Sequence, residues 1–135
     1  MYLRDLNDAQ KALVLDLLIQ AIPEGWQNDP GTRERIDGVC AEMGVAPRYS
    51  EQLVVDAALP MLLDISNTVT MRKVLVELAI QAMPFLEYDV MARTFSEKYA
   101  HLTGLQHGDF EEILRLLEEI ARASQRLDEI VNKPV

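Results

Sequence analysis

The chain has a single cysteine and only two histidines among its 135 residues. One cysteine excludes an internal disulfide, and so few cysteine and histidine ligands exclude a structural zinc site, which needs four. Basic residues are also scarce, since 13 Lys and Arg stand against 22 Asp and Glu, a formal net charge of −9. Because a surface of that sign repels the phosphate backbone, we expect no nucleic-acid binding.

Long apolar runs are missing as well. The most apolar stretch, Leu13 to Ile22, is interrupted by Asp16 and Gln20, whereas a membrane-spanning helix needs roughly 20 apolar residues. The chain opens with charge on both sides of Leu3 and has no signal-peptide pattern. These absences predict a soluble cytoplasmic protein with no membrane insertion.

Helix-forming patterns fill most of the chain. With 49% hydrophobic residues, a chain of 135 residues is long enough to bury one core. Apolar residues recur at helical spacing, and Asn, Asp, Pro and Gly residues mark helix ends. We therefore predict a single all-α domain over residues 1–135 with about seven helices. Their approximate ranges are 7–23, 30–43, 50–59, 60–65, 69–83, 89–103 and 109–132.

Two segments of the chain are similar to each other. Lys11 to Pro23 reads KALVLDLLIQAIP, and Arg72 to Pro84 reads RKVLVELAIQAMP. Each is followed by a polar loop, an amphipathic helix, a glycine and another helix. We predict an internal duplication, with repeat 1 over about residues 6–65 and repeat 2 over about 68–132. The two matching helices are expected to pack at the centre, around a pseudo-two-fold axis.

This pattern resembles the TerB-like family, which is named for tellurite-resistance proteins, and its small bacterial relatives. The segments that carry the resemblance are Leu6 to Pro23, Ile36 to Val45, Val74 to Ala82 and Glu87 to Leu105. The resemblance implies a duplicated helical fold and, in members associated with metal binding, an acidic Asp-Gly loop after each apolar helix. Here those loops carry Glu24-Gly25 and Phe85-Leu86, so the resemblance implies a divergent member without the paired acidic loops.

Four polar side chains in the repeated apolar helices are candidate metal ligands. Asp16 and Glu77 occupy equivalent positions, and Gln20 and Gln81 each follow one turn later on the same face. If the two helices face each other, these side chains converge and hold a divalent cation through oxygen. The structural alternative is that all four lie on the narrow solvent face of two mostly buried helices.

Three other features carry weaker signals. Acids in the two interhelical loops lack the spacing of a calcium loop, and Asp29 and Asp89 are explained as helix caps. Glu97 and His101 lie one turn apart, which suits either a metal or an exposed pair near a helix end. Cys40 lies on a buried stripe, as is typical of an unreactive thiol.

Two features favour a protein partner. Trp26, the only tryptophan, lies in a loop, where it acts either as an anchor for a partner or as a lid over the helix ends. In the last helix, Leu114, Leu116 and Ala121 widen the apolar face beyond one stripe. Such a helix either packs wholly within the monomer or also contacts a second copy, as a homodimer.

Motifs for catalysis are absent: the chain has no phosphate-binding loop, no nucleophile elbow and no His-Glu-x-x-His motif. We therefore expect no enzyme and no cofactor other than the divalent cation considered above. The sequence favours a non-enzymatic interaction or scaffold module with an unidentified protein partner. The alternative is a divalent-metal-binding stress-response protein.

Overall fold

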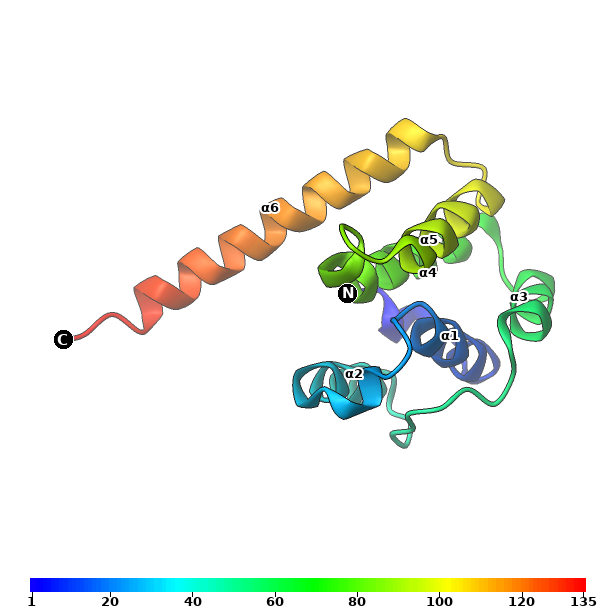
Figure 1. Ribbon diagram of the computed structural model, residues 1–135, viewed down its shortest axis with the longest axis horizontal. Coiled ribbons are helices and arrows are strands. Elements are labelled where there is room, and N and C mark those ends of the chain that lie inside the picture. The colour runs from blue at the N-terminus through cyan, green and yellow to red at the C-terminus, as the bar shows by residue number, and fades with distance from the viewer.

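The computed structural model describes all of residues 1–135 and contains only helices (Figure 1). The six α-helices are α1 (Asp8–Gln20), α2 (Pro30–Met43), α3 (Val55–Asp64), α4 (Thr68–Ala82), α5 (Val90–Leu102) and α6 (His107–Val131). Three 3-10 turns accompany them: η1 (Leu3–Asp5), η2 (Trp26–Asn28) and η3 (Met83–Phe85). The all-α prediction is confirmed, with six α-helices in place of the seven expected.

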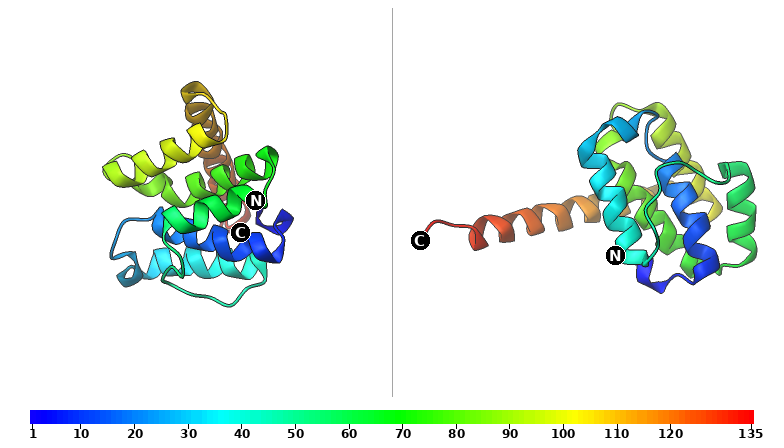
Figure 2. Two further views of the ribbon diagram at one scale, coloured as in Figure 1. Left: turned by 90° about the vertical axis from the view of Figure 1, so that its right-hand side faces the viewer. Right: turned by 90° about the horizontal axis from the view of Figure 1, so that it is seen from below.

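The core forms around α1 and α4, which pack against each other. Eight of the 13 residues of α1 and eight of the 15 residues of α4 are buried, so these two helices are enclosed on most sides. Helix α2 lies beside α1, and α5 lies beside α4, which gives two layers of helices (Figures 1 and 2). Both central helices are thus covered by their own layer and by each other.

Several helix ends follow directly from local sequence signals. Asn7 accepts a hydrogen bond from the Gln10 backbone N–H at 2.9 Å, and the Gln10 side chain accepts one from Asn7, which completes a capping box for α1. Pro30 begins α2, where its missing N–H is no loss. Gly44 ends α2 with φ of 71°, a left-handed conformation that favours glycine.

The region from Ser50 to Ile65 differs from the prediction of two helices separated at Pro60. Residues 50–54 are not helical, and α3 runs without a break from Val55 to Asp64 with Pro60 inside it. The reason lies outside the segment, because side chains of α1 bind backbone groups of Gln52, Leu53 and Val55 and hold this stretch in a non-helical conformation up to Val54. This merges the third and fourth predicted helices into one.

The predicted duplication agrees with the first two helices of each half, α1 and α2 against α4 and α5. It does not agree with the third helices, α3 and α6. A 3-10 turn and an amphipathic helix follow both α1 and α4. The third helices differ, since α3 has 10 residues and packs against α1, whereas α6 has 25 residues and contacts α4 and α5. The duplication therefore stays a prediction from the sequence.

None of the helices combines the length and the apolar character that crossing a membrane requires.

The central position of α4 can be tested with Leu78→Ala. Because Leu78 is fully buried, we expect the variant to lose roughly 2–5 kcal/mol of unfolding free energy. Val69→Ala in the exposed first turn of the same helix is the matched control and is expected to change stability by less than about 0.5 kcal/mol. Urea denaturation measures both; equal losses in the two variants would contradict the position assigned to α4.

Candidate functional site

Asp16 is buried and binds the loop between α2 and α3. One of its carboxylate oxygens lies 2.6 Å from the guanidinium of Arg48 and accepts a hydrogen bond from the Gln52 backbone N–H at 2.8 Å. Arg48 also donates to the carbonyl of Ala12 on α1 at 3.0 Å. The charge of Asp16 is therefore neutralised within the protein, and the side chain ties a distant loop to α1.

Gln20 binds the same loop one helical turn further along α1. Its amide nitrogen donates to the Leu53 carbonyl at 2.9 Å, and its amide oxygen accepts from the Val55 N–H at 3.1 Å. Both peptide groups lie next to the start of α3. Gln20 thus sets the point at which α3 begins.

Glu77 and Gln81 on α4 bind other segments. Glu77 is buried, accepts a hydrogen bond from the Tyr2 backbone N–H at 2.5 Å, and lies 3.1 Å from the amino group of Met1. Gln81 is also buried, and its side-chain and backbone oxygens accept from the guanidinium of Arg35 on α2. Burial is the main cause that lowers the pKa of Arg35 below its usual value.

The four predicted ligands therefore each bind the protein itself. Asp16 and Gln20 hold the loop before α3, Glu77 holds the first residues of the chain, and Gln81 holds α2. Three of these side chains, Asp16, Glu77 and Gln81, are buried, so they do not form a solvent face either. These contacts give the four side chains a structural role, because each supplies a hydrogen-bond partner to a segment outside its own helix.

Trp26 is only 6% exposed and packs edge-on against the ring of Tyr49, with the ring centroids 6.1 Å apart. It lies in η2, directly after α1, and forms part of the core. This arrangement is that of a lid over the end of α1. Cys40 is fully buried, and burial raises the pKa of its thiol, which keeps the sulfur protonated and unreactive.

Glu97, His107 and Glu111 form the one group of potential metal ligands that the fold brings together. Their ligand atoms all lie within 4.8 Å of one another, and all three side chains are exposed. Arg93 binds both carboxylates, with nitrogens 3.0 Å from Glu97 and 2.5 Å from Glu111. The guanidinium already supplies the cation that these carboxylates attract, so the group serves as an ionic link between α5 and α6. Sequence spacing paired Glu97 with His101 instead, because the turn between α5 and α6 was not predictable.

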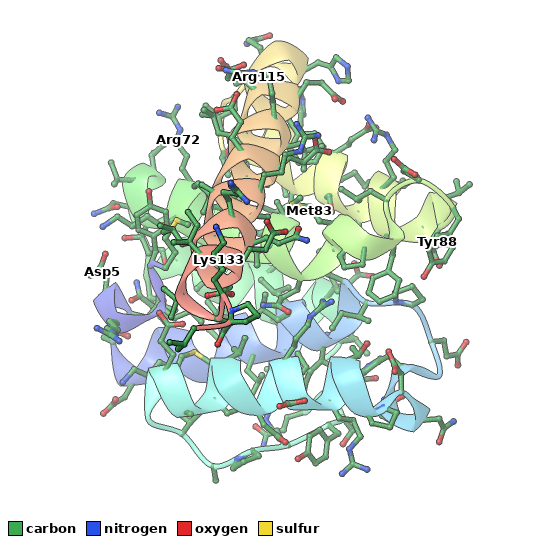
Figure 3. All side chains as sticks on the ribbon, turned by 90° about the vertical axis from the view of Figure 1, so that its left-hand side faces the viewer. Asp5, Arg72, Met83, Tyr88, Arg115 and Lys133 are labelled. Carbon is green, nitrogen blue, oxygen red and sulfur yellow. The ribbon has the colours of Figure 1, made fainter.

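The most unusual surface belongs to α6. Its first part packs onto α4 and α5 through Phe110, Ile113, Leu114 and Leu117. From Glu118 onward every residue is exposed, and the helix projects away from the rest of the protein (Figures 1 and 2). Figure 3 looks along this projection from its free end, with Lys133 near the viewer and Arg115 further back along the helix. We call residues 118–131 the arm.

The arm continues the apolar stripe of the packed part. At alternating intervals of three and four residues the stripe contains Phe110, Ile113, Leu117, Ile120, Ser124, Leu127 and Val131. This heptad spacing is typical of helices that pair along their length. Beside the stripe lie Leu114, Leu116, Ala121, Ala123 and Ile130. Exposed fractions of 51% for Ile120, 63% for Leu127 and 79% for Val131 show that no part of this chain covers the stripe on the arm.

Charges occupy the opposite face of α6 and differ between its two ends. Residues 109–119 contain five acids and one arginine, a net charge of −4, whereas residues 120–133 contain three bases and two acids, a net charge of +1. Ion pairs one turn apart run along this face, for example from Arg115 to Glu112 and Glu119, and from Arg122 to Glu118. The helix is therefore strongly amphipathic and has an acidic first half.

Of the predicted partner-binding residues, Leu116 is 43% exposed and Leu114 is partly buried against the core. The sequence predicted the wide apolar face of α6. It did not predict that packing of this helix on α4 and α5 ends before Glu118. A groove between α3 and α5, described below, gave no signal in the sequence because it depends on where α3 is held.

Comparison of the chain with protein-family models, with curated proteins and with solved structures found no match.

The structural role of Asp16 predicts a stability loss without any dependence on metal. Because Asp16→Asn leaves the Arg48 charge unpaired, we expect roughly 2–4 kcal/mol less unfolding free energy; Arg48 is 19% exposed, which moderates the cost of a fully buried pair. Calcium, magnesium, manganese or zinc should not raise the Tm of the unmodified protein. Asp8→Asn, which removes only an exposed pair with Lys11, is the control and should change little. A metal-induced rise in Tm that disappears in Asp16→Asn would contradict this role.

Proposed function

We propose that this protein is a non-enzymatic interaction module and that the α6 arm is its binding surface. The observation that carries the proposal is the heptad stripe of the arm, which is apolar at three of its four positions, continues the packed stripe of α6 and is exposed throughout residues 118–131. Monomeric proteins rarely leave a contiguous apolar face of that kind in water. The resemblance to the TerB-like family and a cytoplasmic location remain parts of this proposal that rest on sequence pattern alone.

Helix physics supports a need for a partner. The packed turns of α6 nucleate the helix, but residues 118–131 gain no tertiary packing, which supplies most of the stability of helices in proteins. The ion pairs on the polar face of the arm are exposed and add little. A second surface that covers Ile120, Leu127 and Val131 removes apolar area from water and stabilises the helix at the same time.

The partner proposed here is a second copy of this chain, with the two arms antiparallel. A heptad stripe is self-complementary, so the arm of one copy fits the arm of another. Antiparallel pairing of residues 118–131 brings Arg122 of one arm near Asp128 of the other, whereas parallel pairing places each charge beside its own counterpart. A two-fold axis across α6 closes the assembly as a dimer.

The dimer predicts a specific effect of charged residues on the stripe. Ile120→Asp combined with Leu127→Asp places two carboxylates where the arms meet, so we expect the dimer to become a monomer in sedimentation equilibrium. Since both side chains are exposed in the monomer, the Tm of this variant should stay close to that of the unmodified protein when both are measured at low concentration. Gln125→Asp combined with Asn132→Asp, which makes the same charge change at two exposed residues off the stripe, is the control and should remain dimeric. A monomeric unmodified protein at concentrations of hundreds of micromolar would overturn the proposal.

The antiparallel orientation can be tested with Val131→Cys near the free end of the arm. In an antiparallel pair this cysteine lies far from its counterpart, so mild oxidation should give no disulfide-linked dimer. In a parallel pair the two cysteines are adjacent and should cross-link readily. The native thiol does not interfere, because Cys40 is fully buried. Non-reducing electrophoresis of the oxidised dimer distinguishes the two orientations.

A further inference from the structure

A groove separates α3 from α5 on the side of the molecule opposite the arm. The hollow between α3 and α5 has a volume of about 700 Å³. It continues past Val55 and Phe95 into a second hollow of about 820 Å³, which lies between the end of α1, the loop after it and the start of α5. Figure 1 shows α3 and the arm at opposite ends of the molecule, and the left panel of Figure 2 views the side on which α3 lies. The groove exists because the loop bound by Asp16 and Gln20 holds α3 against α1 and away from α5.

The hollow between α3 and α5 has a mainly apolar surface, whereas the larger hollow beside it is lined about equally by polar and apolar groups. Val55 and Leu59 from α3 face Phe95 from α5, and all three are partly buried against the core. At its two ends the groove has Met91, which is 77% exposed, and Leu102, which is 50% exposed. Met91, Phe95 and Leu102 thus form an apolar strip along α5 that is interrupted by Thr94 and Lys98.

The rim of the groove is acidic. Its carboxylates are Glu24, Glu51, Asp56, Asp89 and Glu97, against a single lysine, Lys98, and one histidine, His101. Asp89 caps α5, and Glu97 is paired with Arg93. The other three, Glu24, Glu51 and Asp56, take part in no ion pair, so their charge is directed to solvent around the groove. Such a cleft attracts positive charge.

We propose that this groove binds a basic amphipathic helix of another protein. An apolar strip between two helices accepts the apolar face of a third helix, which is a common mode of peptide recognition. The acidic rim determines the charge of the ligand, because lysines and arginines flanking the apolar face of that helix neutralise Glu24, Glu51 and Asp56. This inference goes beyond the proposed pairing of arms and does not depend on it, since the two surfaces lie at opposite ends of the molecule.

The arm of a second copy is a poorer fit for the groove. Its two basic residues, Arg122 and Arg126, are outnumbered by Glu118, Glu119, Asp128 and Glu129, so the arm has a net charge of −2, the same sign as the rim. A ligand with uninterrupted positive charge beside its apolar face is favoured instead.

The test uses the full chain and a synthetic peptide of 14 residues, with leucines at helical spacing and lysines elsewhere, labelled for fluorescence anisotropy. One control peptide keeps the leucine pattern but has glutamate in place of lysine. A second keeps the composition but has the leucines and lysines in scrambled order. The groove variant is Met91→Lys combined with Leu102→Lys. Its matched control is Met61→Lys combined with Val69→Lys, which makes the same charge change at two exposed residues outside the groove.

We expect the basic amphipathic peptide to bind at 150 mM salt, with affinity at least tenfold weaker in the groove variant and changed less than twofold in the control variant. The acidic and scrambled peptides should not bind. Amide shifts in NMR spectra should be confined to residues around Val55, Met91 and Phe95. Equal weakening in both double variants, equal binding of the scrambled peptide, no binding at all, or shifts confined to the α6 arm would overturn the proposal.

Discussion

The pair of central helices, α1 and α4, is enclosed so completely that its polar side chains have to find partners inside the protein. Asp16 and Gln20 bind the loop before α3, and Glu77 and Gln81 bind the first residues and α2. No buried side-chain nitrogen or oxygen lacks a partner. Because each unpaired buried polar group costs about 1–3 kcal/mol, these contacts fix where the non-helical segments lie. The positions of α2, of the loop before α3 and of the first residues therefore depend on polar side chains of two largely apolar helices.

The same constraint shapes both exposed apolar surfaces. Holding the loop against α1 keeps α3 away from α5 and leaves the groove between them. At the other end, α4 and α5 are too short to cover a helix of 25 residues, so only the first part of α6 is packed. The molecule thus has an exposed helical arm with an apolar stripe at one end and an acidic-rimmed groove at the other. Both surfaces have the size and apolar character of surfaces that pack against helices, which supports the proposed interaction role.

Local signals predicted the helix ends well, because a cap is decided by residues three or four apart. Asn7 with Gln10, and Gly44 at the end of α2, are examples. Features that depend on distant contacts were not predictable. Arg48 reaches Asp16 across 32 residues, and this contact helps keep residues 50–54 out of a helix. The apolar stripe of α6 runs on past Glu118 with the same spacing, so periodicity alone does not show where packing on α4 and α5 ends.

Amide hydrogen exchange along the arm tests the central claim most directly, since it reports whether residues 118–131 are covered in solution. If arms pair, the amides of Ile120, Leu127 and Ile130 become more protected as protein concentration rises, while those of α1 and α4 keep the same protection throughout. Exchange in the arm that is fast and independent of concentration would contradict the claim, because it would show a helix that remains without a partner.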